Sequence, residues 1–157
     1  MSRTLRPVSL TAAAFAPFGT VAALPTPGQR VTVGPPENLR AAVPPRFVCT
    51  AAKPAALPLD VTTMERHRFS SQSFVPMGDA RWLILVAPHA PGGGPDMDAS
   101  IAFLADGTQA ITYRPDTWHH PLTALSDGAR FAVLTFLDGS PDDEEFVPVA
   151  AGLTLAL

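Results

Sequence analysis

Histidine side chains carry most of the chemical potential of this sequence, because imidazole is the only side chain whose ordinary pKa lies near neutrality. Three of the four histidines fall in two short polar segments. The first segment is ERHR, which contains His67 and is soon followed by Gln72. The second is YRPDTWHHP, which contains Tyr113, Arg114, Trp118, His119 and His120. Such side chains exchange protons and form hydrogen bonds with small polar molecules, so these two segments are the candidate site.

Neighbouring strands would bring the two segments together. If both lie on adjacent strands of a barrel, their inward side chains meet in its mouth, which is a usual place for small-ligand sites. His67 and Gln72, with His119 or His120, could then bind one divalent ion. Successive residues of a strand point to opposite faces, so at most one of the two adjacent histidines would join such a site.

Other polar residues favour ordinary structural roles. His89 lies in the proline-flanked stretch APHAP, and we interpret it as a solvated loop residue. Arg66 and Arg68 alternate with His67, so on a strand they would face the opposite side, towards solvent. The acidic run at 142–145 (DDEE) is typical of a solvated turn. A histidine beside tryptophan and proline is itself more often a packed core residue than a catalyst, and that interpretation stands beside the functional one.

The elements that must position these residues are short. Six apolar runs have the length of strands, at 46–50, 69–75, 81–87, 99–104, 110–113 and 131–137. Turn-forming residues separate them. Short strands at such close spacing predict an antiparallel β-barrel or sandwich. The segment 99–105 could instead form a short helix, because alanine and leucine suit both states.

The N-terminal third contains the other expected elements. One helix is expected within residues 5–18, with Thr11 as its N-cap and with Pro17, Phe18 and Gly19 ending it. Residues 19–45 are rich in glycine and proline, which predicts loop with short extended pieces such as 30–33. The predicted fold class is therefore mainly β, with one or two short helices.

Composition limits the classes of protein that fit. The 157 residues suffice for one domain, 1–157, and 46% are hydrophobic. Eighteen prolines exclude a bundle of long helices. A net charge of −3 gives no basic field for nucleic acid, and no apolar run approaches the length of a membrane span. The single cysteine, Cys49, excludes an internal disulfide, and the expected location is the cytoplasm.

The two polar segments also resemble a known family. Residues 64–67 (MERH) and 71–77 (SQSFVPM) resemble the E-R-H…x-Q-x-F-x-P-M signature of ureidoglycolate lyases. Residues 113–122 (YRPDTWHHPL) are similar to that family's Y-x-x-x-x-W-H-H-P-L segment. The resemblance implies a cupin-like β-barrel, usually a homodimer, that cleaves ureidoglycolate to glyoxylate and urea in allantoin degradation. The apolar segment 146–157 could form an edge strand or pack across a partner, and a homodimer is also favoured by its apolar end at 150–157.

The implied reaction assigns a hypothetical role to each residue. His119 would be the base that takes the hydroxyl proton, and His67 the acid to the leaving nitrogen. Tyr113 would donate a hydrogen bond, Gln72 would hold a urea amide, and Arg114 or Lys53 would pair with the carboxylate. Trp118 and His120 would complete the substrate pocket. With a divalent ion, His67, Gln72 and His119 become ligands instead; no organic cofactor is indicated.

The sequence also departs from the family pattern. The family's Asn-Gly…Arg-Tyr-His-Asp segment is replaced by residues 34–45 (GPPENLRAAVPP), and a common arginine is replaced by Ala51 or Ala52. These departures indicate a divergent member, with altered activity or a different small acid as substrate. The alternatives are a non-catalytic cupin-like module that binds a small carboxylate, and another cupin enzyme, such as an isomerase or a metal-dependent oxygenase.

Overall fold

The computed structural model describes residues 3–157, and nearly all of the regular structure in this range is β. The strands are β1 (Arg3–Leu5), β2 (Val8–Ser9), β3 (Gly19–Ala23), β4 (Arg46–Ala51), β5 (Leu59–Asp60), β6 (Thr63–His67), β7 (Gln72–Pro76), β8 (Arg81–Ala87), β9 (Ile101–Asp106), β10 (Gln109–Tyr113), β11 (Trp118–His119), β12 (Thr123–Ala124), β13 (Arg130–Thr135), β14 (Glu144–Pro148) and β15 (Leu153–Leu155). The helix is α1 (Ala12–Phe15). The prediction of a mainly β fold with a short helix is confirmed.

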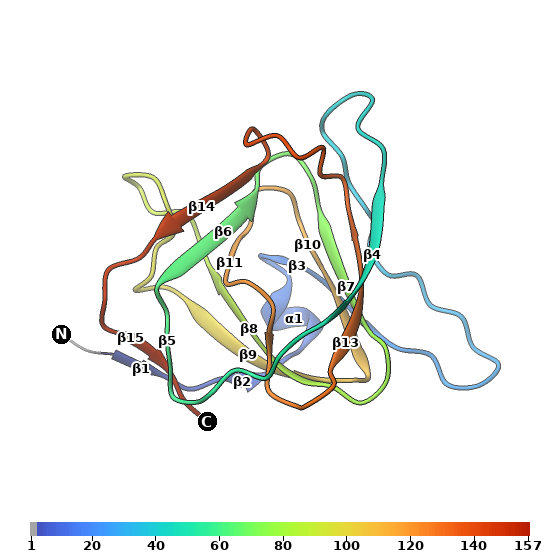
Figure 1. Cartoon of the computed structure of the whole chain (residues 1–157), viewed down its shortest axis with the longest axis horizontal. Helices are drawn as coiled ribbons and strands as arrows, with labels where there is room; N and C mark the ends of the chain where they lie inside the picture. The colour runs from blue at the N-terminus through green and yellow to red at the C-terminus, as the bar shows by residue number, and fades with distance from the viewer. Residues whose placement is uncertain (1–2) are drawn as a thin grey trace.

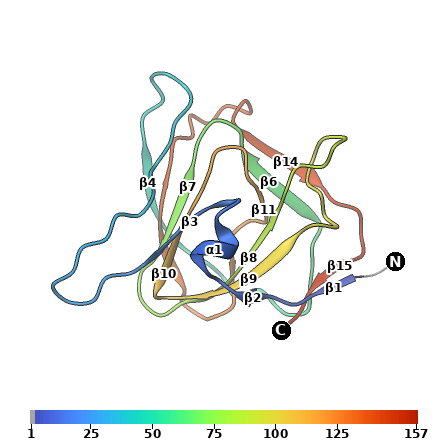
Figure 2. The same ribbon diagram turned by 180° about the vertical axis from the view of Figure 1, so that it is seen from behind.

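Three sheets build the molecule (Figures 1 and 2). A five-stranded sheet has the order β3-β10-β7-β13-β4. A seven-stranded sheet has the order β14-β6-β11-β8-β9-β2, with β12 also pairing with β8. These two sheets face each other and form the barrel. A three-stranded sheet, β1-β15-β5, covers the outer side of the seven-stranded sheet near both chain ends.

Two apolar cores explain the continuous apolar run RWLILVA in β8. Trp82, Ile84 and Val86 pack into the barrel core between the two large sheets. Leu83, Leu85 and Ala87 alternate with them and pack into the outer core, beneath the three-stranded sheet. A strand that is buried on both faces needs apolar residues at every position, which is what the sequence supplies.

The N-terminal helix forms where its cap predicts, but it is short. The Thr11 side chain accepts a hydrogen bond from the Ala14 amide at 3.2 Å, and Phe15 is fully buried in the barrel core. Pro17 prevents a longer helix. Residues 19–23 form a strand rather than the expected loop, residues 30–33 form no strand, and the ambiguous 99–105 segment forms most of β9.

The apolar tail is engaged within its own chain, so the reason first given for a homodimer is wrong. β14 is an edge strand, as expected. β15, however, pairs with β1 on one side and with β5 on the other. Leu153 and Leu155 are buried in the outer core. β15 therefore leaves no open strand edge, because it is paired on both sides.

The acidic run also differs from the solvated turn that was predicted, because Asp143 is completely buried. Its carboxylate accepts hydrogen bonds of 2.6 Å from the Phe69 amide and from the Ser70 hydroxyl. Arg40 lies 3.4 Å away and brings the compensating charge from the loop before β4. Asp143 therefore links the loop before β4, which carries Arg40, to the turn that follows His67.

Replacing Asp143 by alanine is expected to destabilise the fold by about 3–5 kcal/mol, because it leaves the Phe69 amide and the Ser70 hydroxyl without an acceptor and removes one of the two carboxylates paired with Arg40. The matched control is Asp142→Ala, since Asp142 is exposed and its loss should cost less than about 0.5 kcal/mol. Urea unfolding followed by tryptophan fluorescence measures both. Equal effects from the two substitutions would show that Asp143 holds nothing in place.

Candidate active site

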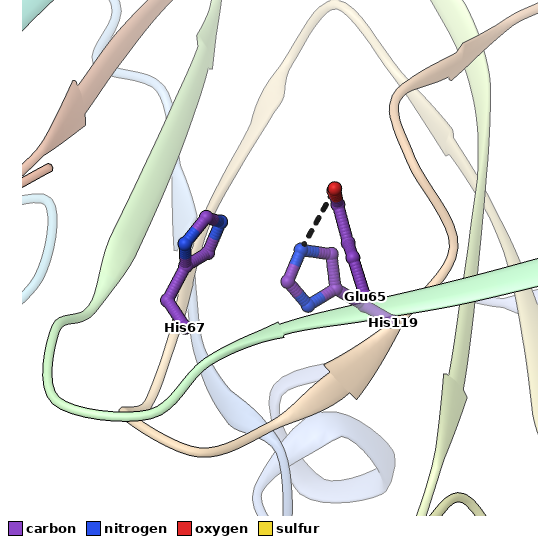
Figure 3. A group of neighbouring side chains, drawn as sticks. All are labelled: Glu65, His67 and His119. Carbon is purple, nitrogen blue, oxygen red and sulfur yellow. Dashed lines mark ion pairs between the residues drawn. The ribbon is translucent and has the colours of Figure 1, made fainter. Parts of the chain in front are cut away.

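Alternation along β6 turns two chemically useful side chains into the barrel. Met64 points to the outer core, so Glu65 and His67 point inward, on the opposite face. Both are buried. On the neighbouring strand, β11, His119 pairs directly with Glu65. The two segments singled out in the sequence therefore converge, as predicted, and Figure 3 shows His67 facing His119 and Glu65.

His119 is surrounded by oxygen atoms. Its Nε2 atom lies 3.2 Å from Glu65 Oε1 and 3.1 Å from Gln72 Oε1. Its Nδ1 atom lies 2.9 Å from the Thr117 carbonyl oxygen. A carbonyl oxygen only accepts, so Nδ1 carries the proton of that bond. A neutral imidazole has no second proton, so the Nε2 position calls for a proton or a cation between the ring and Glu65.

The two ring nitrogens of His67 are buried and make no hydrogen bond of good geometry within residues 3–157. Burial, and then the charge of His119, lower the pKa of His67 to about 4, and the opposing effect of the nearby Gln72 side chain on this pKa is smaller. At neutral pH the ring is therefore uncharged, with a lone pair available. Its centre lies 5.7 Å from that of His119.

Glu65 supplies the negative charge of the site. Burial raises the pKa of Glu65, but its hydrogen bond to His119 and the charges of the surrounding histidines outweigh this, and the pKa is lowered. The carboxylate therefore stays ionised. One ligand atom each from Glu65, His67 and His119 lie within 4.8 Å of one another, so the three residues could hold a metal ion.

Tyr113 closes one side of the group. Its ring stacks on His119 with centres 4.1 Å apart and planes 17° apart. Burial, and then the charge of Glu65, raise the pKa of Tyr113. The phenol therefore keeps its proton and is available as a hydrogen-bond donor.

Four of the predicted site residues lie elsewhere. Trp118 is buried in the outer core, on the face of β11 opposite to His119. His120 is bonded through Nδ1 to Thr123 and Pro121 instead of facing Glu65. Arg114 is exposed, and its side chain contacts the Pro17 carbonyl oxygen at 3.4 Å.

Lys53, the fourth, lies at the opposite end of the barrel. The neighbouring Ala55 bonds to Ala124, which pairs with Trp82, whereas His119 pairs with Val86. Trp82 and Val86 are four residues apart on β8, which corresponds to a distance of about 13 Å along the strand. Lys53 therefore does not reach the site.

Glu65, conversely, belongs to this group although sequence reasoning assigned it no role. The available signal was its spacing, because residues two apart on a strand share a face.

A cluster of polar and aromatic side chains supports the strands that carry the site. This cluster, called the cage below, consists of Arg66, His89, Asp116, Trp118 and Glu145. The guanidinium of Arg66 lies 4.5 Å from the centre of a Trp118 ring and pairs with Asp116 at 2.7 Å and Glu145 at 2.6 Å. Trp118 donates to His89 Nδ1 at 3.2 Å. His89 Nε2 then donates to the Asp116 carbonyl oxygen at 2.8 Å. His89 is exposed as predicted, yet it is bonded within this cage, and Arg66 faces the cage instead of open solvent.

Asp116 adopts the left-handed conformation, with a φ of 67° that is uncommon for a non-glycine residue. Its amide donates to the His67 carbonyl oxygen at 2.6 Å. The cage therefore fixes the backbone of both histidine-bearing strands.

Comparison with known proteins agrees with this geometry. A family model described as ureidoglycolate lyase matches residues 2–153. The chain belongs to the ureidoglycolate lyase family. A ureidoglycolate lyase of Burkholderia mallei (strain NCTC 10229) is 36% identical, covering 97% of this chain and 94% of that protein.

Two further ureidoglycolate lyases are similar. The one from Azotobacter vinelandii is 35% identical, covering 87% of this chain and 88% of its own. The one from Rhizobium leguminosarum bv. trifolii is 37% identical, covering 87% of both chains. A solved dTDP sugar isomerase from Desulfovibrio desulfuricans G20 reaches a TM-score of only 0.42 at 17% identity, over 83% of this chain and 82% of that chain.

Within residues 3–157, no helix is long and apolar enough to cross a membrane.

Proposed function

We propose that this protein cleaves ureidoglycolate into glyoxylate and urea, as a carbon–nitrogen lyase serving allantoin degradation in the cytoplasm. Family membership supports the substrate. The observation that carries the proposal is the convergence of Glu65, His67 and His119 beneath the stacked ring of Tyr113. Such a group of buried polar side chains is unusual in a barrel core and is suited to a small polar substrate.

The reaction itself defines what the site must do. In ureidoglycolate, one carbon carries a hydroxyl, a carboxylate and a urea nitrogen. The hydroxyl loses its proton as the C–O bond becomes a carbonyl, the C–N bond breaks, and the departing nitrogen takes up a proton to give urea. A base must therefore stand at the hydroxyl and a donor at the nitrogen.

His119, together with Glu65, supplies the base. Without a bound ion, His119 takes the hydroxyl proton, and the carboxylate of Glu65, 3.2 Å from Nε2, stabilises the resulting imidazolium. As the C–N bond breaks, the imidazolium passes this proton to the departing nitrogen to give urea, while Tyr113 keeps its own proton and donates a hydrogen bond to that nitrogen. Gln72, 3.1 Å from His119, holds the amide end of the urea.

We further propose that Glu65, His67 and His119 hold a divalent ion in the working enzyme. The donor set fits. His67 offers an unpartnered nitrogen, Glu65 is ionised, and His119 donates Nδ1–H to a backbone carbonyl, an arrangement common among metal-bound histidines. A divalent ion bound there would polarise the substrate's hydroxyl and carboxylate. In the proposed set of metal ligands, Glu65 therefore replaces Gln72, which had been predicted from the sequence.

The proposed activity is tested by incubating the purified protein with racemic ureidoglycolate while urea and glyoxylate are followed separately. Because the substrate decomposes spontaneously, a reaction without protein is the baseline. Equal formation of both products above this baseline supports the lyase. Binding without turnover would instead favour the non-catalytic module, and oxygen consumption would favour another cupin enzyme.

We propose that a homodimer forms through β4. This edge strand has no partner on its outer side within residues 3–157. Phe47 projects from it with 68% of its surface exposed. Exposed apolar edge strands are pairing sites unless they are covered. A second copy of the chain is therefore the proposed occupant.

Sedimentation is expected to show a dimer that Phe47→Ser converts largely to monomer. Phe146→Ser is the matched control, because Phe146 is also exposed, at 54%, but lies on β14. A Phe47→Ser protein that stays dimeric would place the interface elsewhere.

A further inference from the structure

Four inward-facing residues form a row across the five-stranded sheet, at the end of the barrel that holds the histidines. Arg46, at the start of β4, pairs with Thr135 at the end of β13. The neighbouring pair Leu134–Ser73 places Thr135 next to Gln72 on β7. Gln72 in turn pairs with Tyr113 on β10. Four strands therefore contribute one residue each to the same level as the catalytic group, and β4 and β13 meet this level at the upper end of the barrel in Figure 1.

Alternation shows that Arg46 and Thr135 face the barrel interior. On β13, Phe131 and Val133 lie in the barrel core, so Thr135 shares their face. On β4, Val48 packs against the same core, whereas Phe47 is exposed outward. Arg46 therefore lies on the inner face, directly above Val48, at the open rim.

Two of these residues have unused polar groups. Thr135 is only 3% exposed, and its hydroxyl is buried without a partner. A buried hydroxyl without a partner is costly, which points to a ligand that satisfies it. Within residues 3–157, the side chain of Arg46 makes neither an ion pair nor a hydrogen bond.

Carboxylates also lie near this rim. Glu144 pairs with His67 across β14 and β6. Burial raises the pKa of Glu144, as do the charges of Glu65 and Asp143, while Arg46 lowers it. Asp143 is already paired with Arg40. An anionic substrate that enters here meets the carboxylates of Glu65 and Glu144, and Arg46 is a cation that can offset them.

We propose that Arg46 and Thr135 form the subsite for the carboxylate of the substrate. This inference rests on the proposed function and identifies the substrate class of the same site as a small 2-hydroxy acid anion. The guanidinium donates two parallel hydrogen bonds to the carboxylate, and the Thr135 hydroxyl donates a third. Arg46 thereby takes the role for which the sequence had suggested Lys53 or Arg114.

Access favours the same residues. His67 and His119 are each no more than 2% exposed. A substrate therefore reaches them when side chains at the rim move aside. Arg46 is exposed there and is free to close over a bound carboxylate.

The test compares a charged substrate with its neutral counterpart. Arg46→Met keeps the aliphatic stem and is expected to raise KM for ureidoglycolate about 30-fold, because a charge-assisted bidentate pair is lost. Thr135→Val should raise KM about fivefold. Hydroxymethylurea has the same hydroxyl and urea nitrogen but no carboxylate, so its turnover should change less than twofold in both variants. Arg81→Met, an exposed arginine at the other end of β8, is the matched control.

Calorimetry with oxalurate separates this inference from the lyase itself. If wild-type protein cleaves ureidoglycolate but Arg46→Met leaves KM unchanged, the subsite is refuted and the lyase stands. If wild-type protein has no turnover but binds oxalurate, and Arg46→Met abolishes that binding, the subsite stands and the lyase fails. Equal losses for ureidoglycolate and hydroxymethylurea would show a merely structural role for Arg46, as would absence of oxalurate binding by the wild type.

Discussion

Replacing His119 by alanine is expected to lower kcat/KM for ureidoglycolate by about a thousandfold or more, within the range that a positioned base contributes. The ring lies at the centre of the site, in contact with Glu65, Gln72 and Tyr113. Its loss removes the base in the metal-free reaction and a ligand in the metal-bound one, so both forms of the proposal predict the same result. Initial rates of urea release measure it.

The alanine variant also leaves a cavity and an unpaired buried carboxylate, so folding must be checked. His119→Asn keeps polarity and much of the volume, and it should lose activity to a similar degree while unfolding at nearly the wild-type temperature. His120→Ala is the comparison on the same strand. Because His120 is bonded to Thr123 outside the group, its effect should stay below tenfold. Wild-type rates in His119→Asn would remove this histidine from the mechanism.

Convergence of the two polar segments was predictable because strand alternation and turn chemistry act locally. Proline and glycine positions set short strands, and inward histidines on adjacent strands must then approach each other. The short helix followed from Thr11 and Pro17 in the same way. Asp143 was not predictable, since its burial depends on Arg40, which is distant in sequence and is brought to it by the fold.

Which core each side chain faces depends on the register in which the strands pair. No local sequence pattern determines that register. Trp118 adjoins His119 in sequence but packs in a different core, because a second layer covers the outer side of β11. Arg46 belongs to an apolar run that indicates only an ordinary strand. Its importance emerges from pairing with Thr135 at the rim. Long-range pairing of this kind decides which charges surround the substrate.

Metal removal is expected to have the second large effect. The purified protein should contain about one divalent ion per chain, and dialysis against a chelator should lower turnover about a hundredfold or more, with recovery when a divalent ion is restored. Metal analysis by mass spectrometry and the urea assay measure content and activity on the same samples. The three donor atoms lie within 4.8 Å and are buried, so bound ion should exchange slowly.

Two variants decide which residues hold the ion. His67→Ala should lose both the ion and the activity, because His67 is the member of the group without any other partner. Gln72→Ala should retain the ion while KM rises, since Gln72 bonds to His119 but does not belong to the group. This contrast separates the ligand set in the structure from the one expected in the sequence, where Gln72 stood in place of Glu65. Full activity in protein shown to be metal-free would leave His119 as the base and Glu65 as its counter-ion.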